Sequence, residues 1–270
     1  MKLKDKVVII TGGSSGIGRS CAFAFGLEGA KIVITGRNQD SLLRASDELR
    51  KSNIEILAIN ADVSLEEDNK RLIAETLNAY GKIDILINNA GISMRSLFSE
   101  VDLSVIKKVM DINFYGTVYA TKYALPEILK TKGTIVGISS IAGFRGLPGR
   151  TGYSASKFAM QGFLEALRTE LLHTGVNVLL ACPGFTNSNI RSTALNKNGN
   201  IQGESPLDEE KMMSSEEVAK EILKGVINKK RDLILTFQGK LTVFLNKRFP
   251  AFMDKMVYNH FKKEPDSPIK

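Results

Sequence analysis

The sequence predicts a single α/β domain built on a doubly wound, seven-stranded parallel sheet with helices on both faces. Seven short runs of apolar and β-branched residues recur along the chain. Most are continuous rather than alternating, which is typical of strands that are covered on both faces. Stretches with helical periodicity separate these runs, and such alternation predicts parallel strands joined by right-handed crossovers.

The elements follow in order along the chain. The expected strands are residues 6–10, 31–35, 54–59, 83–88, 133–139, 176–181 and 232–237. Helical periodicity covers 20–30, 41–51, 67–81 and 216–228, and the long segment between the fourth and fifth strands holds two helices, 104–113 and 116–131. We expect a catalytic domain over 1–238 and an amphipathic C-terminal extension over 239–270.

A polar stretch over 191–215 interrupts the alternation after the sixth strand. Loops of this length inside a compact domain often cover a site, so we predict a substrate lid over 185–215. A long exposed loop is the alternative. Phe144, Leu147, Phe185 and Met212 indicate an apolar substrate site near this lid.

Composition excludes several classes of protein. A chain of 270 residues with 43% hydrophobic and 24% charged residues is ordinary for a globular protein. Two cysteines are too few for a disulfide framework, and no secretory signal or spanning segment is evident, so we expect a cytoplasmic protein. The two histidines have no ligand spacing around them, and no metal site is expected.

The net charge of +8 is compatible with nucleic acid, an anionic membrane or an anionic ligand such as a nucleotide phosphate. The basic run at 229–231 lacks a nucleic-acid-binding fold around it, so no nucleic-acid partner is expected. The remaining two explanations depend on the motifs described next.

A glycine-rich turn follows the first strand and opens a helix. Residues 11–18 read TGGSSGIG, with the spacing G-x-x-x-G-x-G. Glycines at such a turn permit close approach of the backbone to a pyrophosphate, and the helix N-terminus supplies free N–H groups. The position in the first strand-to-helix turn predicts a dinucleotide site.

The end of the second strand predicts which dinucleotide binds. An acid at this turn would bind the ribose 2′-hydroxyl of NAD, whereas a basic group accommodates the 2′-phosphate of NADP. The chain has Arg37 there and no acid, which favours NADP(H). A solvated surface arginine is the alternative.

Tyr153 and Lys157 are separated by one helical turn, so their side chains share a face of the helix. An ammonium beside a phenol favours the phenolate and is expected to lower the phenol pKa. The tyrosine then becomes a general acid–base near neutral pH. The pair alone is a weak signal, because this spacing also occurs by chance.

Together these motifs resemble the short-chain dehydrogenase/reductase family in its single-domain form with a Y-x-x-x-K site. The resemblance runs from Lys4 to about Asn189, with Ser140 thirteen and Asn113 forty residues before the tyrosine. It implies a Rossmann-type fold. The motifs that carry it are TGGSSGIG (11–18), Asp62-Val63, Asn88-Asn89-Ala90-Gly91, Asn113, Ser139-Ser140, Tyr153-Ser154-Ala155-Ser156-Lys157 and Pro183-Gly184.

The resemblance implies a role for each catalytic residue. Tyr153 would exchange a proton with the substrate oxygen, and Ser140 would stabilise the charge on that oxygen. Ser139 would have only a supporting position. Lys157 would lower the tyrosine pKa and hold the nicotinamide ribose, and Asn113 would anchor a water relay to the lysine.

The resemblance also implies the cofactor contacts. Asp62 would meet the adenine, Asn88 the ribose region, and the backbone after Pro183 the nicotinamide carboxamide. The expected cofactor-binding residues are Gly12, Ser14, Ser15, Gly16, Ile17, Gly18, Arg37, Asp62, Val63, Asn89, Ala90, Gly91, Tyr153, Lys157, Pro183, Gly184 and Thr186.

The C-terminal extension departs from many relatives. Bacterial 3-oxoacyl-carrier-protein reductases end soon after a final strand with an aspartate–glycine–glycine close, which this chain lacks. The ending is more similar to the branch related to 11-beta-hydroxysteroid dehydrogenases and their lipid-associated relatives. Apolar residues mixed with lysines suit an interfacial helix on anionic lipid. A helical pair broken at Pro250 that packs on its own domain or a second subunit is the alternative.

These observations predict an NADP-dependent oxidoreductase that interconverts a ketone or aldehyde and an alcohol on an apolar, lipid-like or steroid-like substrate. A homodimer or homotetramer is expected, and peripheral membrane contact through the tail remains open. The alternatives are a carrier-protein reductase-like enzyme, a non-catalytic nucleotide-binding regulatory protein and a membrane-surface protein whose tail is its main function.

Overall fold

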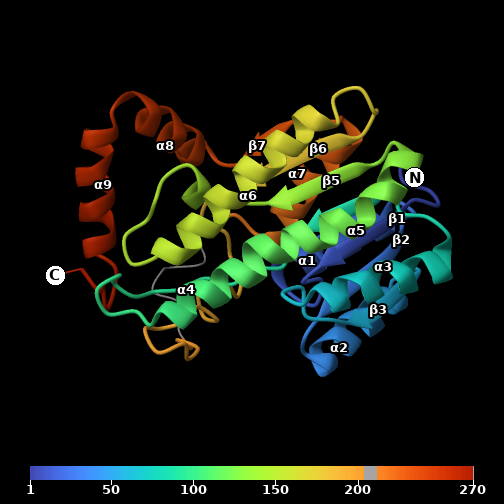
Figure 1. Cartoon of the computed structure of the whole chain (residues 1–270), viewed down its shortest axis with the longest axis horizontal. Coiled ribbons are helices and arrows are strands. Elements are labelled where there is room, and N and C mark those ends of the chain that lie inside the picture. Colours follow the sequence, from blue (N-terminus) through green and yellow to red (C-terminus); the bar gives the residue numbers. More distant parts are fainter. Residues whose placement is uncertain (204–211, 270) are drawn as a thin grey trace.

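A seven-stranded parallel sheet forms the centre of the molecule (Figure 1). The computed structural model describes residues 1–203 and 212–269. The strand order is β3-β2-β1-β4-β5-β6-β7, which confirms the doubly wound sheet predicted from the sequence. The strands are β1 (Val7–Thr11), β2 (Lys31–Gly36), β3 (Ile56–Asn60), β4 (Ile85–Asn88), β5 (Thr134–Ile138), β6 (Asn177–Cys182) and β7 (Asp232–Ile234).

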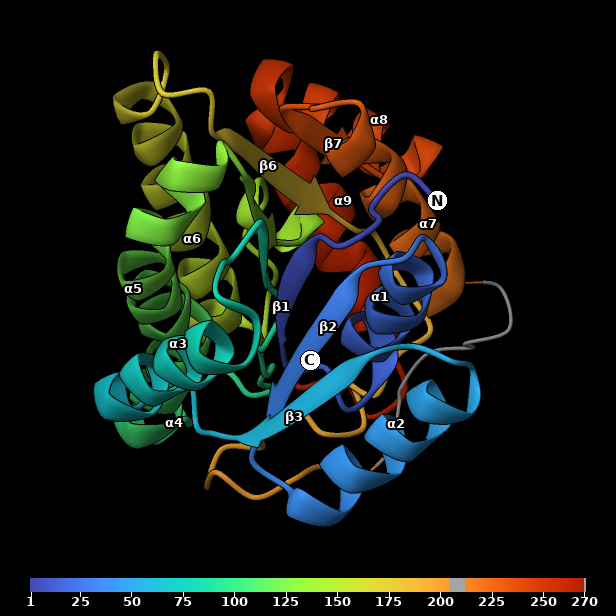
Figure 2. The ribbon, with the colours of Figure 1, turned by 90° about the vertical axis from the view of Figure 1, so that its right-hand side faces the viewer.

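Helices cover both faces of the sheet (Figure 2). One face carries α1 (Gly16–Leu27), α2 (Gln39–Lys51) and α7 (Ser215–Ile227). The other carries α3 (Glu66–Tyr80), α4 (Leu103–Met110), α5 (Gly116–Thr131) and α6 (Thr151–Glu170). Each face buries its own apolar cluster, because strand residues alternate between the two sides. Strands covered in this way are apolar throughout, as β1 is, with all five residues buried.

The two helices expected between the fourth and fifth strands form one continuous rod. A π-helical segment, Asp111–Tyr115, joins α4 to α5 without leaving right-handed helical torsion angles. Single π turns inside α-helices occur frequently at functional sites. This one contains Asn113, whose side chain is fully buried.

The final strand is shorter than the predicted run of 232–237 and ends at Ile234. Thr236 has a φ of 68°, which turns the chain out of the sheet, and its side chain accepts a hydrogen bond from Gly239 N at 3.1 Å. The torsion angle and the cap start a helix where the β-branched pattern predicted further strand.

The C-terminal extension is the predicted pair of helices, α8 (Phe237–Arg248) and α9 (Pro250–Lys262), broken at Pro250. In Figure 1 they lie at the end of the molecule where α6 begins. One stripe of α9 packs on the domain through a small cluster formed by Met253, Val257 and Phe261 with Leu147. Arg145 forms an ion pair with Asp254 on the same helix.

Candidate active site

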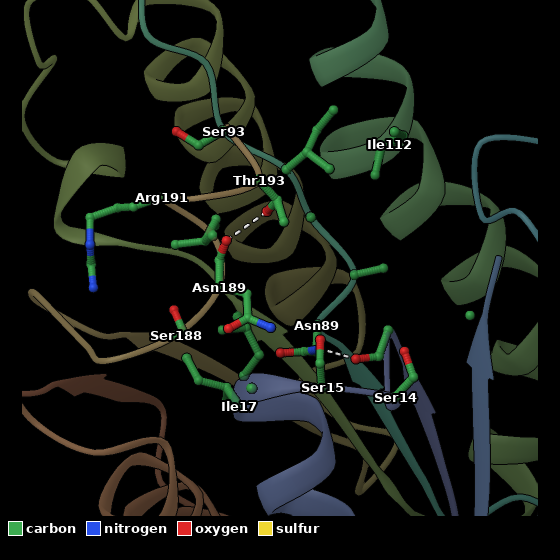
Figure 3. A pocket seen from close by; sticks show the side chains of 18 of the residues that line it. Ser14, Ser15, Ile17, Asn89, Ser93, Ile112, Ser188, Asn189, Arg191 and Thr193 are labelled. Carbon is green, nitrogen blue, oxygen red and sulfur yellow. Dashed lines mark hydrogen bonds between the residues drawn. The ribbon is translucent and has the colours of Figure 1, made fainter. Parts of the chain in front are cut away.

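A large cavity lies where the carboxyl ends of β1 and β4 meet. The chain departs from β1 and β4 in opposite directions across the sheet, and ligands of doubly wound sheets bind at such switch points. The cavity has a volume of about 1280 Å³. Figure 3 shows Ser14, Ser15 and Ile17 at one end and Ser93 and Ile112 at the other, with Ser188 and Asn189 between them.

The glycine-rich turn forms one wall of this cavity and requires its glycines. Gly12 has a φ of +64°, where other residues are strained. A Cβ on Gly18 would lie 2.3 Å from the carbonyl oxygen of Gly12 and 2.4 Å from Asn89 Nδ2. Gly18 therefore does not line the cavity itself; it lets α1 start close against the turn.

Thr11 fastens this turn to the neighbouring strand. Its hydroxyl accepts hydrogen bonds from the backbone N–H groups of Asn89 and Ala90, both at 3.0 Å. The Asn89 side chain donates to the carbonyls of Thr11 and Gly12 at 2.9 and 3.0 Å. The predicted cofactor-binding residues began at Gly12 and left out Thr11, although the glycine-rich motif starts with Thr11.

Asn88 lies differently from its neighbour. Its side chain is buried and donates to Thr121 Oγ1 at 3.0 Å, so it points between the helices and away from the cavity. The residues that line the cavity here are Asn89, Ala90 and Gly91, and not Asn88 as expected. Adjacent residues of an extended chain point to opposite sides, which explains the difference.

Basic side chains surround the end of the cavity beside β2. Arg37 lies there as predicted, and its nearest carboxylate, Asp62, is 3.9 Å away. Arg44 on α2 also lines this end and donates to Ser41 Oγ at 3.0 Å. Arg44 was missed from the sequence, because nothing in its surroundings marks one turn of an amphipathic helix as facing a site.

Tyr153 and Ser140 meet at the middle of the cavity. Tyr153 lies in the first turn of α6 and is only 9% exposed. Ser140 caps the short 3-10 turn Ile141–Gly143 and accepts a hydrogen bond from Ala142 N at 3.1 Å. Ser139 accepts from Gln161 Nε2 at 3.0 Å and donates to the carbonyl of Lys157 at 3.4 Å, so it supports α6.

Lys157 and Asn113 lie behind this pair. Lys157 Nζ donates to the carbonyl of Ile138 at 2.8 Å. The Asn113 side chain accepts from Ile92 N at 2.8 Å and donates to Ile92 O and Ser156 Oγ, both at 2.9 Å. A Cβ on Gly91 would be 3.2 Å from Asn113 Oδ1 and 3.5 Å from Lys157 Nζ. The polar ends of Asn113 and Lys157 therefore both lie next to Gly91.

The expected lowering of the Tyr153 pKa is wrong for this structure. Burial raises the pKa of the phenol, because the phenolate loses its hydration, and it outweighs the opposing hydrogen bond with Ser140. The positive charges of Arg150 and Arg191 also act to lower it. Lys157 is itself buried, which lowers the pKa of its ammonium to about 8.

The structure brings most of the predicted residues to one cavity. Gly18, Asp62 and Asn113 are not among the residues that line it, and all three lie directly behind lining residues or turns. The predicted residues that line it are Gly12, Ser14, Ser15, Gly16, Ile17, Arg37, Val63, Asn89, Ala90, Gly91, Ser140, Tyr153, Lys157, Pro183, Gly184 and Thr186.

The part of the cavity away from the glycine-rich turn is lined by aliphatic side chains together with polar ones such as Ser93, Thr193 and Arg191 (Figure 3). Leu147 and Phe185 line it as predicted, whereas Phe144 packs against a core cluster and Met212 is not at the cavity wall. Residues 204–211 of the predicted lid lie outside the described residues. Sequence analysis missed the aliphatic lining of this end: Ile112, Ile190, Leu195 and Ile201.

Within residues 1–203 and 212–269 no group of three His, Cys, Asp or Glu side chains is placed to hold a metal ion. The same part of the chain contains no helix both long and apolar enough to cross a membrane.

Comparison with known proteins places this chain in a family. The sequence model described as short chain dehydrogenase matches residues 6–199. Fold and match together show that the chain belongs to the short-chain dehydrogenase family, the oxidoreductases that act on alcohol and carbonyl groups.

Two curated relatives illustrate the similarity. Dehydrogenase/reductase SDR family member 7B of Mus musculus is 36% identical over 98% of this chain and 84% of its own length. The 11-beta-hydroxysteroid dehydrogenase-like 4A of Arabidopsis thaliana is 41% identical over 68% of this chain and 62% of its own length. The second match therefore leaves more than a third of that relative uncovered.

Two solved structures share the fold. A short chain dehydrogenase/reductase from Burkholderia phymatum in complex with NAD has a TM-score of 0.82, 24% identity, and coverage of 93% of this chain and 96% of its own. An alcohol dehydrogenase from Thermococcus sibiricus complexed with 5-hydroxy-NADP has a TM-score of 0.75, 22% identity, and coverage of 85% and 95%.

Proposed function

We propose that this chain is an NADP-dependent oxidoreductase that interconverts a ketone or aldehyde and an alcohol on an apolar, lipid-like or steroid-like substrate. The observation that carries the proposal is one cavity that holds the glycine-rich turn, Arg37 and Arg44 at one end and Tyr153 with Ser140 further in. The same cavity is lined by several aliphatic side chains, among them Leu147, Ile190 and Leu195, beside polar ones.

The residues present fit a dinucleotide. The turn at Gly12 and Gly18 has no room for side chains, and α1 begins at Gly16 with its free N–H groups toward the cavity. Arg37 and Arg44 supply two guanidinium groups where a 2′-phosphate would lie, and guanidinium pairs well with phosphate oxygens. The two guanidinium groups support NADP(H) over NAD(H) as the cofactor.

The dinucleotide, when bound, supplies or accepts the hydride. The chain's own residues handle the proton and the charge. Tyr153 is a phenol at neutral pH, since burial raises its pKa, so it donates a proton to a carbonyl oxygen during reduction. Ser140 donates a hydrogen bond to the same oxygen as negative charge develops on it. The aliphatic side chains of the lining would contact the apolar part of the substrate.

A screen of apolar ketones and aldehydes with NADPH and with NADH tests this function. We expect oxidation of NADPH with at least one steroid or long-chain carbonyl, and a kcat/KM for NADPH about ten times that for NADH or more. Small polar ketones are the control and should react more slowly, because they cannot fill the aliphatic part of the lining. Tight NADPH binding without turnover of any carbonyl would favour the regulatory alternative.

We further propose that the C-terminal helices attach to an anionic membrane surface. Several large apolar side chains of α8 and α9 are exposed, among them Phe237, Phe244 and Phe252. Six basic residues accompany them: Lys240, Lys247, Arg248, Lys255, Lys262 and Lys263. The one acid within 237–263, Asp254, is paired with Arg145. Exposed aromatics within a positive field suit anionic headgroups.

Flotation of the full chain with lipid vesicles measures this attachment. We expect it to float with vesicles that contain phosphatidylserine and to remain unbound with pure phosphatidylcholine. Replacing Phe244 and Phe252 with serine should reduce flotation about tenfold or more, because the variant loses two aromatic rings that would be buried in the membrane surface. Leu172→Ser is the matched control, since Leu172 is exposed at the far end of α6. Equal flotation of all three proteins would contradict the proposal.

The homodimer or homotetramer expected from the sequence stays a prediction.

A further inference from the structure

Glu264, just after α9, is a buried acid in a segment that sequence analysis treated only as a basic, apolar tail. Its side chain is 2% exposed. The side chains of Arg95 and Arg150 around it are 6% and 11% exposed. Buried charges of this kind are stable only when they are paired. The three residues come from the tail, the loop after β4 and the residue that precedes α6.

The contacts within this cluster are close. Arg150 Nη2 donates to both carboxylate oxygens of Glu264, at 3.1 and 3.0 Å. Arg95 Nη2 lies 3.5 Å from Glu264 Oε2 and donates to the carbonyl of Pro265. The Arg150 guanidinium also stacks on the Phe261 ring at 4.7 Å. The tail thus holds Arg150 from two sides.

Arg150 connects this cluster to the active site. It is the residue immediately before α6, and its carbonyl accepts from Ser154 N at 2.8 Å in the turn that carries Tyr153. Burial raises the pKa of Tyr153, and the positive charge of Arg150 opposes that rise. Burial likewise lowers the pKa of Arg150, and the charges of Glu264 and Tyr153 oppose that fall. The cluster holds two positive charges and one negative charge, so Glu264 offsets half of the positive charge of the cluster.

We propose that Glu264 is a positioning residue for the active site: through its ion pair with Arg150, it fixes the start of α6 and limits the positive charge that acts on Tyr153. The C-terminal tail is then part of the catalytic apparatus rather than only a surface attachment. This inference rests on the proposed role of Tyr153 as acid–base. It concerns a residue that lies outside the motifs shared with the family.

Other groups also act on Tyr153, and the test must separate them from Glu264. Lys157 lies on the same helix with Nζ 5.8 Å from the centre of the phenol ring. The remaining influences are the Ser140 hydroxyl beside β5, Arg191 in the loop after β6, and Cys182 on β6. Glu264→Gln leaves all of these in place and removes only the negative charge that neutralises Arg150.

Removal of the Glu264 carboxylate charge is expected to move the titration of the Tyr153 phenol to lower pH, because the charge of Arg150 is then no longer offset. NMR of the full chain labelled at tyrosine Cζ, with Tyr153→Phe to assign the signal, follows the phenol directly. In Glu264→Gln the titration of this signal should move down by about half a pH unit or more. The pH profile of NADPH-dependent reduction of phenanthrenequinone should move the same way, with kcat changed more than the KM for NADPH.

Two further variants separate charge from structure. The double variant Glu264→Gln with Arg95→Gln restores the net charge of the cluster. The Tyr153 titration in this double variant should therefore return toward that of the wild type. A purely structural role of Glu264 predicts instead that the double variant departs further from the wild type than Glu264→Gln does. Asp254→Asn removes the acid of α9 itself, which is exposed and paired with Arg145, and should leave the Tyr153 titration unchanged. An unchanged titration in a folded Glu264→Gln protein, or an equal shift in Asp254→Asn, would overturn the inference. If the wild type does not turn over the quinone but the Tyr153 titration still moves in Glu264→Gln, the result counts against the proposed function and not against this inference.

Discussion

Tyr153→Phe is expected to lower the rate of carbonyl reduction by about a hundred- to ten-thousandfold, because the phenyl ring keeps the packing and removes the proton donor. The ring is buried in an apolar cluster with Met94 and Leu195, so the fold should tolerate the change. Steady-state kinetics on a substrate from the NADPH screen measure the loss. The affinity for NADPH should remain within about threefold, since the variant changes no group at the turn or at Arg37.

Tyr80→Phe provides the matched control. Tyr80 ends α3, is half-buried and does not line the cavity, so removal of its hydroxyl should leave kcat unchanged. A Tyr153→Phe protein that reduces the substrate at the wild-type rate would exclude the proposed acid. A defect of equal size in both variants would indicate a loss of stability rather than of proton transfer.

The pH dependence follows from the direction of the Tyr153 pKa. Burial raises this pKa, so the phenol is the predominant form at neutral pH and can act as the acid in reduction. Reduction should fall as the pH rises through the raised value, and alcohol oxidation should increase over the same interval because it needs the phenolate. Reduction rates of the wild type and of Tyr153→Phe, measured across that pH interval, distinguish proton donation by Tyr153 from proton donation by solvent.

Much of the fold was predictable because its signals are local. Continuous apolar runs such as β1 are typical of strands covered on both faces, and their alternation with helices predicts parallel strands joined by right-handed crossovers. The shortened β7 was not predictable, because its end depends on the left-handed torsion angle at Thr236. The composition of the run around it is still that of a strand.

The site was predictable where a motif is contiguous or has a fixed spacing, as for Gly12 and Tyr153. Residues that join the site through tertiary structure carry no such mark. Arg44 faces the cavity only because α2 packs in one orientation, and Glu264 reaches Arg150 across more than a hundred residues of sequence. The direction of the Tyr153 pKa shift was missed for a related reason: burial is a property of the folded chain.

Arg37→Ala is expected to weaken NADPH binding by about ten- to a hundredfold and to leave NADH binding unchanged. A guanidinium paired with phosphate contributes roughly 1.5–3 kcal/mol, and only NADPH carries the 2′-phosphate. Arg37 is suited to this role, since its closest carboxylate, Asp62, is 3.9 Å away and competes only weakly. Fluorescence titration of the full chain with each dinucleotide measures both affinities without any substrate.

Two arginines of α2 refine the test, because they share a helix and differ in what they face. Arg44 lines the cavity, so Arg44→Ala should reduce NADPH affinity in the same direction as Arg37→Ala, by a smaller factor because Ser41 also engages its guanidinium. Arg50 pairs with Asp47 at 3.0 Å outside the cavity, and Arg50→Ala removes the same charge from the protein. If Arg50→Ala weakened NADPH binding as much as Arg37→Ala, net charge and not a phosphate contact would explain the preference. If Arg37→Ala weakened NADH and NADPH equally, the arginine would bind a part common to both dinucleotides, and the assignment of NADP(H) would fail.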